Sequence, residues 1–400
     1  MGISFQSLRI PFLPLLITLS FSIMFNLLRI KAALLFFLFL VVGCEEPYLP
    51  KVLEMPNAYL VVSGFINTAG STTINLSYTQ NLYEEGVPPV ESGARVSVEL
   101  EDGGQIELYE RSPGIYVNEL NIGPGAKCRL KIVTSTGKQY QSEYVEAKQT
   151  PAIDRVSWRA DSDALGIYVS THDATNKSNY YSWTFDETWH YTSAFPTNLE
   201  YKDGKVTYNF YMEDIYNCWR SENSSNILIG TSTKLTSDVI SDYLVTQVPS
   251  ASAKLGIKYS ILVKQRALSK EAFNYYEKLK RNTESIGTLF DPQPSQLTGN
   301  ISCTSSPEEP VIGFITASTV EEKRLFVSRS EMPQHWRPAY QRCEYDTIMV
   351  DEVREQLEGG FKLPFGEYMV GMTVVGYMVS QKSCVDCRVY GTNVRPPFWE

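Results

Sequence analysis

From residue 57 onward the chain is a succession of short segments in which apolar and polar residues alternate, the period of a half-buried β-strand. Ile74, Leu76 and Tyr78 are separated by polar residues, and the same alternation covers 95–100. The sequence Asp-Gly-Gly at 102–104 predicts the turn of a hairpin. Further strands are expected at 106–108, 115–117, 127–133 and 139–145. About six or seven short strands without a helix predict an immunoglobulin-like or transthyretin-like β-sandwich that ends near Thr150-Pro151.

The remainder of the chain is longer and less regular, and we expect a larger β-rich domain with a few helices. The expected strands are 155–158, 166–170, 180–191, 205–211, 259–265, 311–317, 324–327 and 367–379. One helix is well marked: Ser269 is a suitable N-cap, Glu271 complements the helix dipole, and apolar residues recur every three or four positions up to Ile286, before Gly287. Shorter helices are expected at 238–244 and 351–357.

The apolar run near the start of the chain has the form of a bacterial lipoprotein signal. Arg29 and Lys31 supply a basic start, residues 32–42 an apolar segment of secretory length, and Gly43-Cys44 a small residue followed by a thiol that can be acylated. Cys44 is therefore predicted to be the lipidated N-terminus of the mature protein, anchored to a membrane and outside the cytoplasm. Two acyl chains suffice for stable anchoring, at about 0.8 kcal/mol for each buried methylene.

Alternative interpretations of this region remain open. The stretch 11–42 is long enough for a transmembrane anchor, although prolines and basic residues interrupt it. Translation from Met24 would give an ordinary signal and the same mature protein. Glu45-Glu46 resembles the acidic surface-export signal of Bacteroidota lipoproteins, or else forms a solvated spacer. The predicted organisation is a signal peptide at 1–43, a lipid-anchored tether at 44–56, the sandwich at 57–150 and the β-rich domain at 151–400.

The charge of the mature chain excludes one class of partner. Three of the 36 basic residues and none of the 45 acidic residues precede Cys44, which leaves 33 basic side chains and a formal charge of about −12. Such a surface repels nucleic-acid phosphates, and no basic cluster interleaved with aromatic residues offsets it. DNA and RNA are therefore not expected partners.

Six cysteines remain once Cys44 is assigned to the lipid, and an extracytoplasmic compartment permits disulfides. Cys128 alternates in phase with apolar neighbours and is predicted to be a buried thiol. The disulfide candidates are Cys218, Cys303, Cys343, Cys384 and Cys387. An odd number leaves at least one of them unpaired or bonded to another chain. We expect Cys384 and Cys387 each to pair with a partner distant in sequence, but spacing does not choose among the connectivities.

Cys384 and Cys387 also have the spacing of a zinc half-site or a redox pair. A zinc site needs a second pair of ligands, and His335 and Cys343 lie at no recognisable ligand spacing. A redox pair should open a helix after a strand, whereas this pair leads into the C-terminal tail. No metal or cofactor is predicted.

Catalytic patterns are absent from the sequence as well. There is no Gly-x-Ser-x-Gly elbow, no His-Glu-x-x-His, no phosphate-binding loop and no dinucleotide fingerprint. His190 lies in an aromatic strand, 183–191, whose polar members are expected to face solvent. The carboxylates Asp161 and Asp163 lie in a turn-like stretch and are interpreted as a solvated surface. No catalytic residue is predicted, and we do not expect an enzyme.

Ordered matches along the mature chain resemble the DUF4249 family. The matching segments are 60–66, Asn217-Cys218-Trp219-Arg220, 259–263, 271–276, 290–295, 299–301, 311–314 and the tail from 384–388 to 397–399. The resemblance implies an outer-membrane lipoprotein of Bacteroidota, often encoded beside a TonB-dependent receptor. It implies no catalytic residue and no ligand.

The leading functional hypothesis is an accessory lipoprotein that helps a TonB-dependent transporter capture or admit a nutrient. The numerous tyrosines and tryptophans offer flat amphipathic contact area for glycans, peptides or a partner barrel, although most aromatic residues fill strand cores. The loop 288–299, with Phe290, Pro292 and Pro294, is a candidate partner contact stiffened by proline. The alternatives are a free-standing structural or adhesive surface lipoprotein and, third, a hydrolase whose site is assembled only in three dimensions.

Overall fold

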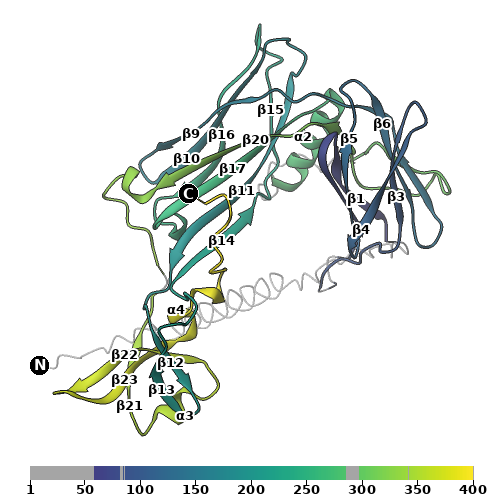
Figure 1. Ribbon diagram of the computed structural model, residues 1–400. Coiled ribbons are helices and arrows are strands. Elements are labelled where there is room, and N and C mark those ends of the chain that lie inside the picture. Colours follow the sequence, from purple (N-terminus) through teal and green to yellow (C-terminus); the bar gives the residue numbers. More distant parts are fainter. Residues whose placement is uncertain (1–57, 82–83, 85, 285–296, 341, 400) are drawn as a thin grey trace, which may run out of the picture. The chain divides into compact units, whose positions relative to one another are not determined.

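The computed structural model describes residues 58–81, 84, 86–284, 297–340 and 342–399. Its strands form two β-sandwiches and a small C-terminal module, shown as a ribbon in Figure 1. The predicted fold class, mainly β with a few helices, is confirmed. Within the described ranges no helix has the length and apolar character needed to cross a membrane.

The first β-sandwich is a continuous sheet folded over its own core. Strand β4 pairs with β3 through one half and with β5 through the other, and thereby joins the two layers. The predicted alternation is confirmed, because Ile74 and Leu76 in β2 and Val96 and Val98 in β3 are buried. Its first eight strands are β1 Leu60–Asn67, β2 Ala69–Tyr78, β3 Arg95–Leu100, β4 Gln105–Ser112, β5 Ile115–Asn121, β6 Lys127–Val133, β7 Gln139–Ser142 and β8 Val145–Glu146.

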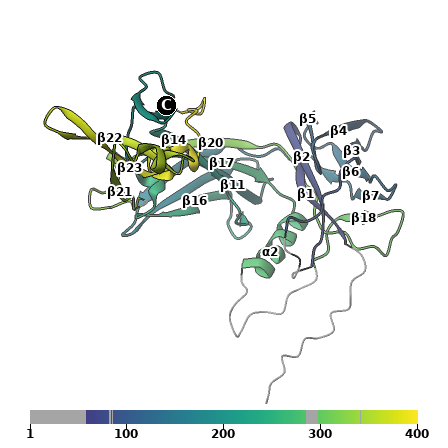
Figure 2. The same ribbon diagram turned by 90° about the horizontal axis from the view of Figure 1, so that it is seen from below.

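A segment from much later in the chain completes this sandwich. Strand β18 (Ile301–Cys303) pairs antiparallel with β7, as Figure 2 shows, and β19 (Ala317–Ser318) pairs parallel with β1. The predicted division at residue 150 leaves the segment 297–319 out of the first sandwich, since local alternation carries no sign of a pairing over such a distance. The predicted strand 311–317 is mostly irregular.

Two residues explain how this segment lies so close to β1. Gly313 has φ +146°, and a Cβ there would lie 2.2 Å from the carbonyl oxygen of Val62, so only glycine permits the approach. The buried Asn300 side chain donates to the carbonyl of Ile315 (2.9 Å) and accepts from its N–H (2.8 Å). The Asn300 side chain thereby satisfies both backbone groups of Ile315, while Ile312 and Thr316 form backbone hydrogen bonds to β1.

The second β-sandwich packs two sheets on one apolar core (Figure 1). One sheet has the order β16-β10-β9, and the other has the order β14-β11-β17-β20 with β15 also paired to β11. Trp183 is fully buried at the centre, where its Nε1 donates to Gln265 (2.8 Å). The strands are β9 Ile153–Ala160, β10 Ala164–Asp173, β11 Tyr180–Thr192, β14 Asn217–Asn223, β15 Leu228–Thr231, β16 Asp238–Pro249, β17 Lys258–Ala267 and β20 Glu321–Ser328.

The helices agree with two of the three predictions. α2 covers Lys270–Glu284 and begins, as predicted, at Ser269, whose hydroxyl accepts from the N–H of Ala272 (3.1 Å). α3 (Val353–Leu357) confirms the helix expected at 351–357. The helix expected at 238–244 is wrong. This segment belongs to β16, where a register shift and positive φ at Asp242 break the strand alternation that would have identified it.

The small C-terminal module is built from two separate stretches of chain. A hairpin from 199–208 lies against the sheet β21-β23-β22, around a core of Ile348, Val353, Leu357 and Val379. The chain then forms α4 (Lys382–Val385) and returns to the second sandwich. The module's strands are β12 Leu199–Lys202, β13 Lys205–Tyr208, β21 Tyr345–Met349, β22 Lys362–Val370 and β23 Thr373–Gln381, and the 3-10 turns of the chain are η1 Ala253–Leu255, η2 Arg329–Glu331 and η3 Cys387–Val389.

Candidate functional site

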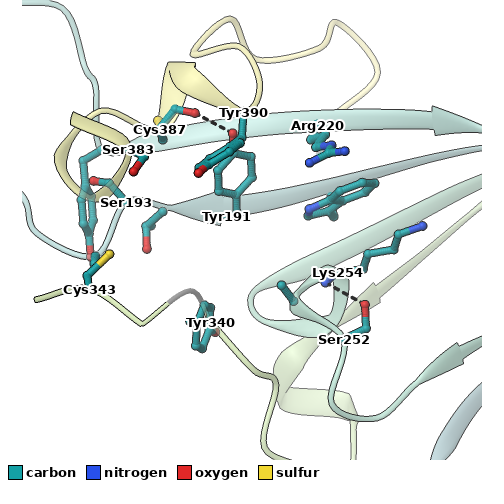
Figure 3. Close-up of a pocket in the computed structure, with 15 residues that line it drawn as sticks. Tyr191, Ser193, Arg220, Ser252, Lys254, Tyr340, Cys343, Ser383, Cys387 and Tyr390 are labelled. Carbon is teal, nitrogen blue, oxygen red and sulfur yellow. Dashed lines mark hydrogen bonds between the residues drawn. The ribbon is translucent and has the colours of Figure 1, made fainter. Parts of the chain in front are cut away.

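A cavity of about 760 Å³ opens at one end of the second sandwich, beside α4 and η3 (Figure 3). Its walls come from the ends of β11 and β14, from η1, from the chain before β21, and from α4 with η3. Five aromatic side chains line it: Trp189, Tyr191, Tyr216, Tyr340 and Tyr390. It therefore joins parts of the chain that are far apart in sequence.

Two disulfides hold the C-terminal wall in place. Cys218 in β14 is bonded to Cys387 in η3, and Cys343, before β21, is bonded to Cys384 in α4. Both Cys384 and Cys387 thus pair with distant partners. Cys303, the remaining candidate, is a free buried thiol. Among the described residues no cluster of histidine, cysteine or carboxylate side chains has the arrangement of a metal site.

Cys128 is likewise free and fully buried in the first sandwich, as its alternation predicts. Burial raises the pKa of its thiol to about 11, because the charged thiolate is poorly solvated there. The group is therefore an apolar core residue rather than a nucleophile at neutral pH.

A chain of ion pairs runs along one wall of the cavity. Glu187 is buried and accepts hydrogen bonds from the Tyr259 hydroxyl and the Lys254 ammonium group, both at 2.6 Å. Lys254 also contacts Glu222 (2.9 Å), which pairs with Arg220 (3.0 Å). The prediction that the polar members of 183–191 face solvent is therefore wrong for Glu187 and Thr188, which are both buried. Lys254 of η1 covers Glu187, and Thr188 pairs with Ser221 of β14.

The pKa values of these groups follow from burial and from their partners. Desolvation disfavours the charged form of Lys254, but its hydrogen bonds to the two carboxylates outweigh this and raise its pKa. Burial, together with the adjacent Glu187 charge, holds the pKa of Tyr259 well above its ordinary value. The hydrogen bond from Lys254 lowers the pKa of Glu222. The wall thus combines two basic and two acidic side chains that are paired with one another.

Some aromatic side chains of the wall already contact other groups of the protein, and others do not. The Lys254 ammonium group lies 4.9 Å and the Arg220 guanidinium carbon 5.6 Å from the ring centroid of Trp189, so cations already cover this ring. The Tyr191 hydroxyl donates to the carbonyl of Cys387 (2.7 Å). Tyr340 and Tyr390 are about half exposed, and their hydroxyls form no hydrogen bond to a described residue. These two side chains, the tyrosine pair, are free to contact a ligand.

The C-terminal tail covers the edge and outer face of the same sheet. Thr392 and Trp219 exchange two backbone hydrogen bonds (2.8 and 3.0 Å), and the ring of Trp399 lies edge-on to that of Trp219. His190 stacks on the other side of this cluster, with its ring centroid 5.1 Å from Trp219. The tail therefore covers β11 beside His190, on the face opposite to Trp189 and Tyr191, which line the cavity.

The stability of the protein is expected to fall as the pH drops below about 6.5, because of His190. Burial lowers the pKa of His190, although its hydrogen bond to Asn217 (3.1 Å) opposes the shift. Between the folded and unfolded pKa values the unfolded state binds more protons, so stability rises with pH through that window. Thermal unfolding of His190→Gln from pH 5 to 8 should show a shallower slope than the native protein. His335→Gln, at an exposed site, is the matched control, and equal slopes in all three proteins would contradict the prediction.

Other candidate residues from the sequence are not brought into this cavity. Cys44 and the loop residues Phe290, Pro292 and Pro294 lie outside the described residues. His172 pairs with Asp154 at the surface (2.8 Å). The residues that sequence reasoning missed are Glu187, Trp189, Arg220 and Lys254. They come from three separate elements, and no local spacing connects them.

The fold and the cavity together define a protein of linked β-sandwich modules with a disulfide-framed cavity. The chain belongs to the family described as a domain of unknown function, DUF4249, whose model matches residues 45–324. No curated protein sequence matches this one.

Among solved structures, the chain is similar to a segment of two fibronectin type-III domains from chicken tenascin, with 10% identity over 52% of this chain and 91% of that chain and a TM-score of 0.14. A putative carbohydrate binding protein from Bacteroides uniformis has 8% identity over 53% and 90%, with a TM-score of 0.15. A DUF3823 family protein from Parabacteroides merdae has 8% identity over 52% and 90%, with a TM-score of 0.13. Likenesses at this level carry no argument about function.

Proposed function

We propose that this protein is a lipid-anchored outer-membrane lipoprotein of Bacteroidota that captures a nutrient as the accessory of a TonB-dependent transporter. The observation that carries the proposal is the cavity of about 760 Å³ at the end of the second sandwich. Its volume lies within the range of small-molecule sites, and its wall combines aromatic rings with a few polar groups, as such sites do. Two disulfides keep its C-terminal wall ordered before a ligand arrives, which lowers the entropy cost of binding.

The N-terminal sequence supports the membrane anchor and the compartment. Gly43-Cys44 after an apolar run is the pattern of an acylated cysteine, and Glu45-Glu46 follows it directly. Disulfides persist in oxidising compartments outside the cytoplasm. Two pairs of bonded cysteines in the folded part therefore agree with export of the mature chain.

The C-terminal module supports a protein partner. The tip of the β22–β23 hairpin and the neighbouring end of β21 expose apolar side chains, with Met372 98% exposed and the others about half exposed. This surface, the methionine edge, consists of Met349, Val350, Met369, Val370 and Met372. Exposed apolar patches mark interaction sites, and methionine adapts its shape to a partner surface. The methionine edge is a second candidate contact beside the loop 288–299.

Affinity purification of the tagged, acylated protein from solubilised outer membranes tests the proposal. We expect stoichiometric recovery of a TonB-dependent barrel, identified by mass spectrometry. The variant Met369→Glu/Met372→Glu should lose most of the barrel, whereas Val87→Glu, which charges an exposed apolar site on the first sandwich, should retain it.

The outcomes separate the candidate functions. Recovery of the lipoprotein alone would refute the transporter partnership and favour a free-standing structural or adhesive protein. If the Met369→Glu/Met372→Glu variant still recovers the barrel, the transporter partnership stands, but the methionine edge is not part of the contact.

A further inference from the structure

We infer that the cavity binds a neutral oligosaccharide, whose ring faces pack on the tyrosine pair and whose hydroxyl groups bond to the hydroxyl groups of the wall. The inference names the ligand class for the site in the proposed function and therefore rests on that function. It is carried by the pairing of the wall's charges, by its unbonded hydroxyls and by the covered edge of β14.

The paired charges of the wall disfavour an ionic ligand. Arg220, Glu222, Lys254 and Glu187 form one continuous series of contacts between 2.6 and 3.0 Å. Each cation has a carboxylate partner, and both cations also lie against Trp189. An anionic ligand would compete with Glu187 and Glu222 for the same two cations, and weakening either pair costs free energy in a half-buried site. Arg220 and Lys254, the two charged residues that line the cavity, are thus already neutralised by Glu222 and Glu187 next to them.

The remaining polar groups suit a ligand that both donates and accepts hydrogen bonds. The hydroxyls of Thr192, Tyr216, Tyr340, Ser383 and Tyr390 line the cavity and form no hydrogen bond to a described residue. A hydroxyl can act as donor and as acceptor, so this set matches another set of hydroxyls. Sugar rings also present apolar C–H faces, and the half-exposed rings of the tyrosine pair supply the complementary flat surface.

An extended peptide fits the site less well. Peptides bind many β-proteins by adding a strand to an open sheet edge. The edge nearest the cavity is β14, where Trp219 already exchanges backbone hydrogen bonds with Thr392 of the tail. The cavity therefore offers side chains rather than a row of backbone donors and acceptors.

A glycan array probed with the full acylated protein in detergent tests the inference. The array should carry neutral oligosaccharides together with uronic-acid and amino-sugar oligomers of the same length. We expect binding to neutral members above both charged sets, followed by calorimetry on the best neutral ligand. Tyr340→Ala/Tyr390→Ala should weaken that binding about tenfold or more, because two stacking rings are lost. Tyr109→Ala, an exposed tyrosine of the first sandwich, should bind like the native protein.

Each result decides the inference. Preferential binding of a charged oligomer, absence of binding to every neutral glycan, or unchanged affinity in the doubly substituted protein would overturn it. Both tyrosines are half exposed, and near-native circular dichroism of the variants excludes misfolding as the cause of a loss. Recovery of the transporter barrel is measured separately, so a failure of glycan binding with the barrel retained would refute the ligand class alone.

Discussion

Replacement of both Cys218 and Cys387 by serine should lower the free energy of unfolding by about 4 kcal/mol. The bond joins residues 169 positions apart, so its loss releases a long loop in the unfolded chain. It is also the covalent bond between β14 and the C-terminal wall of the cavity. We therefore expect ligand affinity to fall together with stability. Urea unfolding without oxidant or reductant measures the loss of unfolding free energy. Calorimetry measures the loss of ligand affinity.

The second disulfide provides the matched control for this prediction. Cys343 and Cys384 are 41 positions apart and enclose the sheet of the C-terminal module. Their replacement by serine should cost about 3 kcal/mol because the released loop is shorter. If the Cys218/Cys387 variant unfolds at the same urea concentration as the native protein, the tail is held by its packing, and the covalent bond is not what stabilises the site.

Glu187→Ala should destabilise the protein by about 3 kcal/mol. The substitution leaves the Tyr259 hydroxyl without its acceptor in a fully buried position and removes one of the two carboxylates that contact Lys254. Glu187→Gln keeps a hydrogen-bond acceptor for the Tyr259 hydroxyl, so its free energy of unfolding should fall less than that of Glu187→Ala. The measurement is chemical unfolding at pH 7.

Glu222→Ala is the control for the buried pair. Its side chain is 40% exposed, so its contacts with Lys254 and Arg220 are screened by solvent and should be worth about 1 kcal/mol or less. If Glu187→Ala and Glu222→Ala lower the free energy of unfolding by the same amount, burial does not determine the strength of the ion pairs around Lys254.

Sequence patterns predicted the helices and strands that are determined by residues close together in the sequence. β6 was predicted at its observed bounds because apolar and polar residues alternate along it, and every second residue from Cys128 to Ile132 is indeed buried. α2 was predicted because Ser269 caps it and its apolar spacing is regular. β16 was missed because a bulge at Asp242 interrupts its alternation. The signals in these three cases lie within a few residues of the element itself.

The cavity was beyond such reasoning for a physical reason. Trp189, Arg220 and Lys254 meet only after β11 pairs with β14 and η1 closes over the strand end. The cysteines indicated that the tail is held by distant partners, but their spacing is compatible with several pairings. Peptide mapping of the disulfides would have indicated that Cys218 and Cys343 lie close to the C-terminal tail, at the same site.

The position of β19 beside β1 has a consequence for how the chain acquires its structure. The edge of β1, which Ile66 and Asn67 offer to Ala317 and Ser318, stays open until more than 300 residues have been synthesised. The first sandwich, although it begins the folded chain, is then among the last parts to be finished, in contrast to the usual order in which N-terminal domains fold first. During that interval its open strand edge invites pairing with other chains. Folding of this chain therefore requires either a factor that binds the open edge or a supply of the later segment that is faster than association of the half-made sandwich.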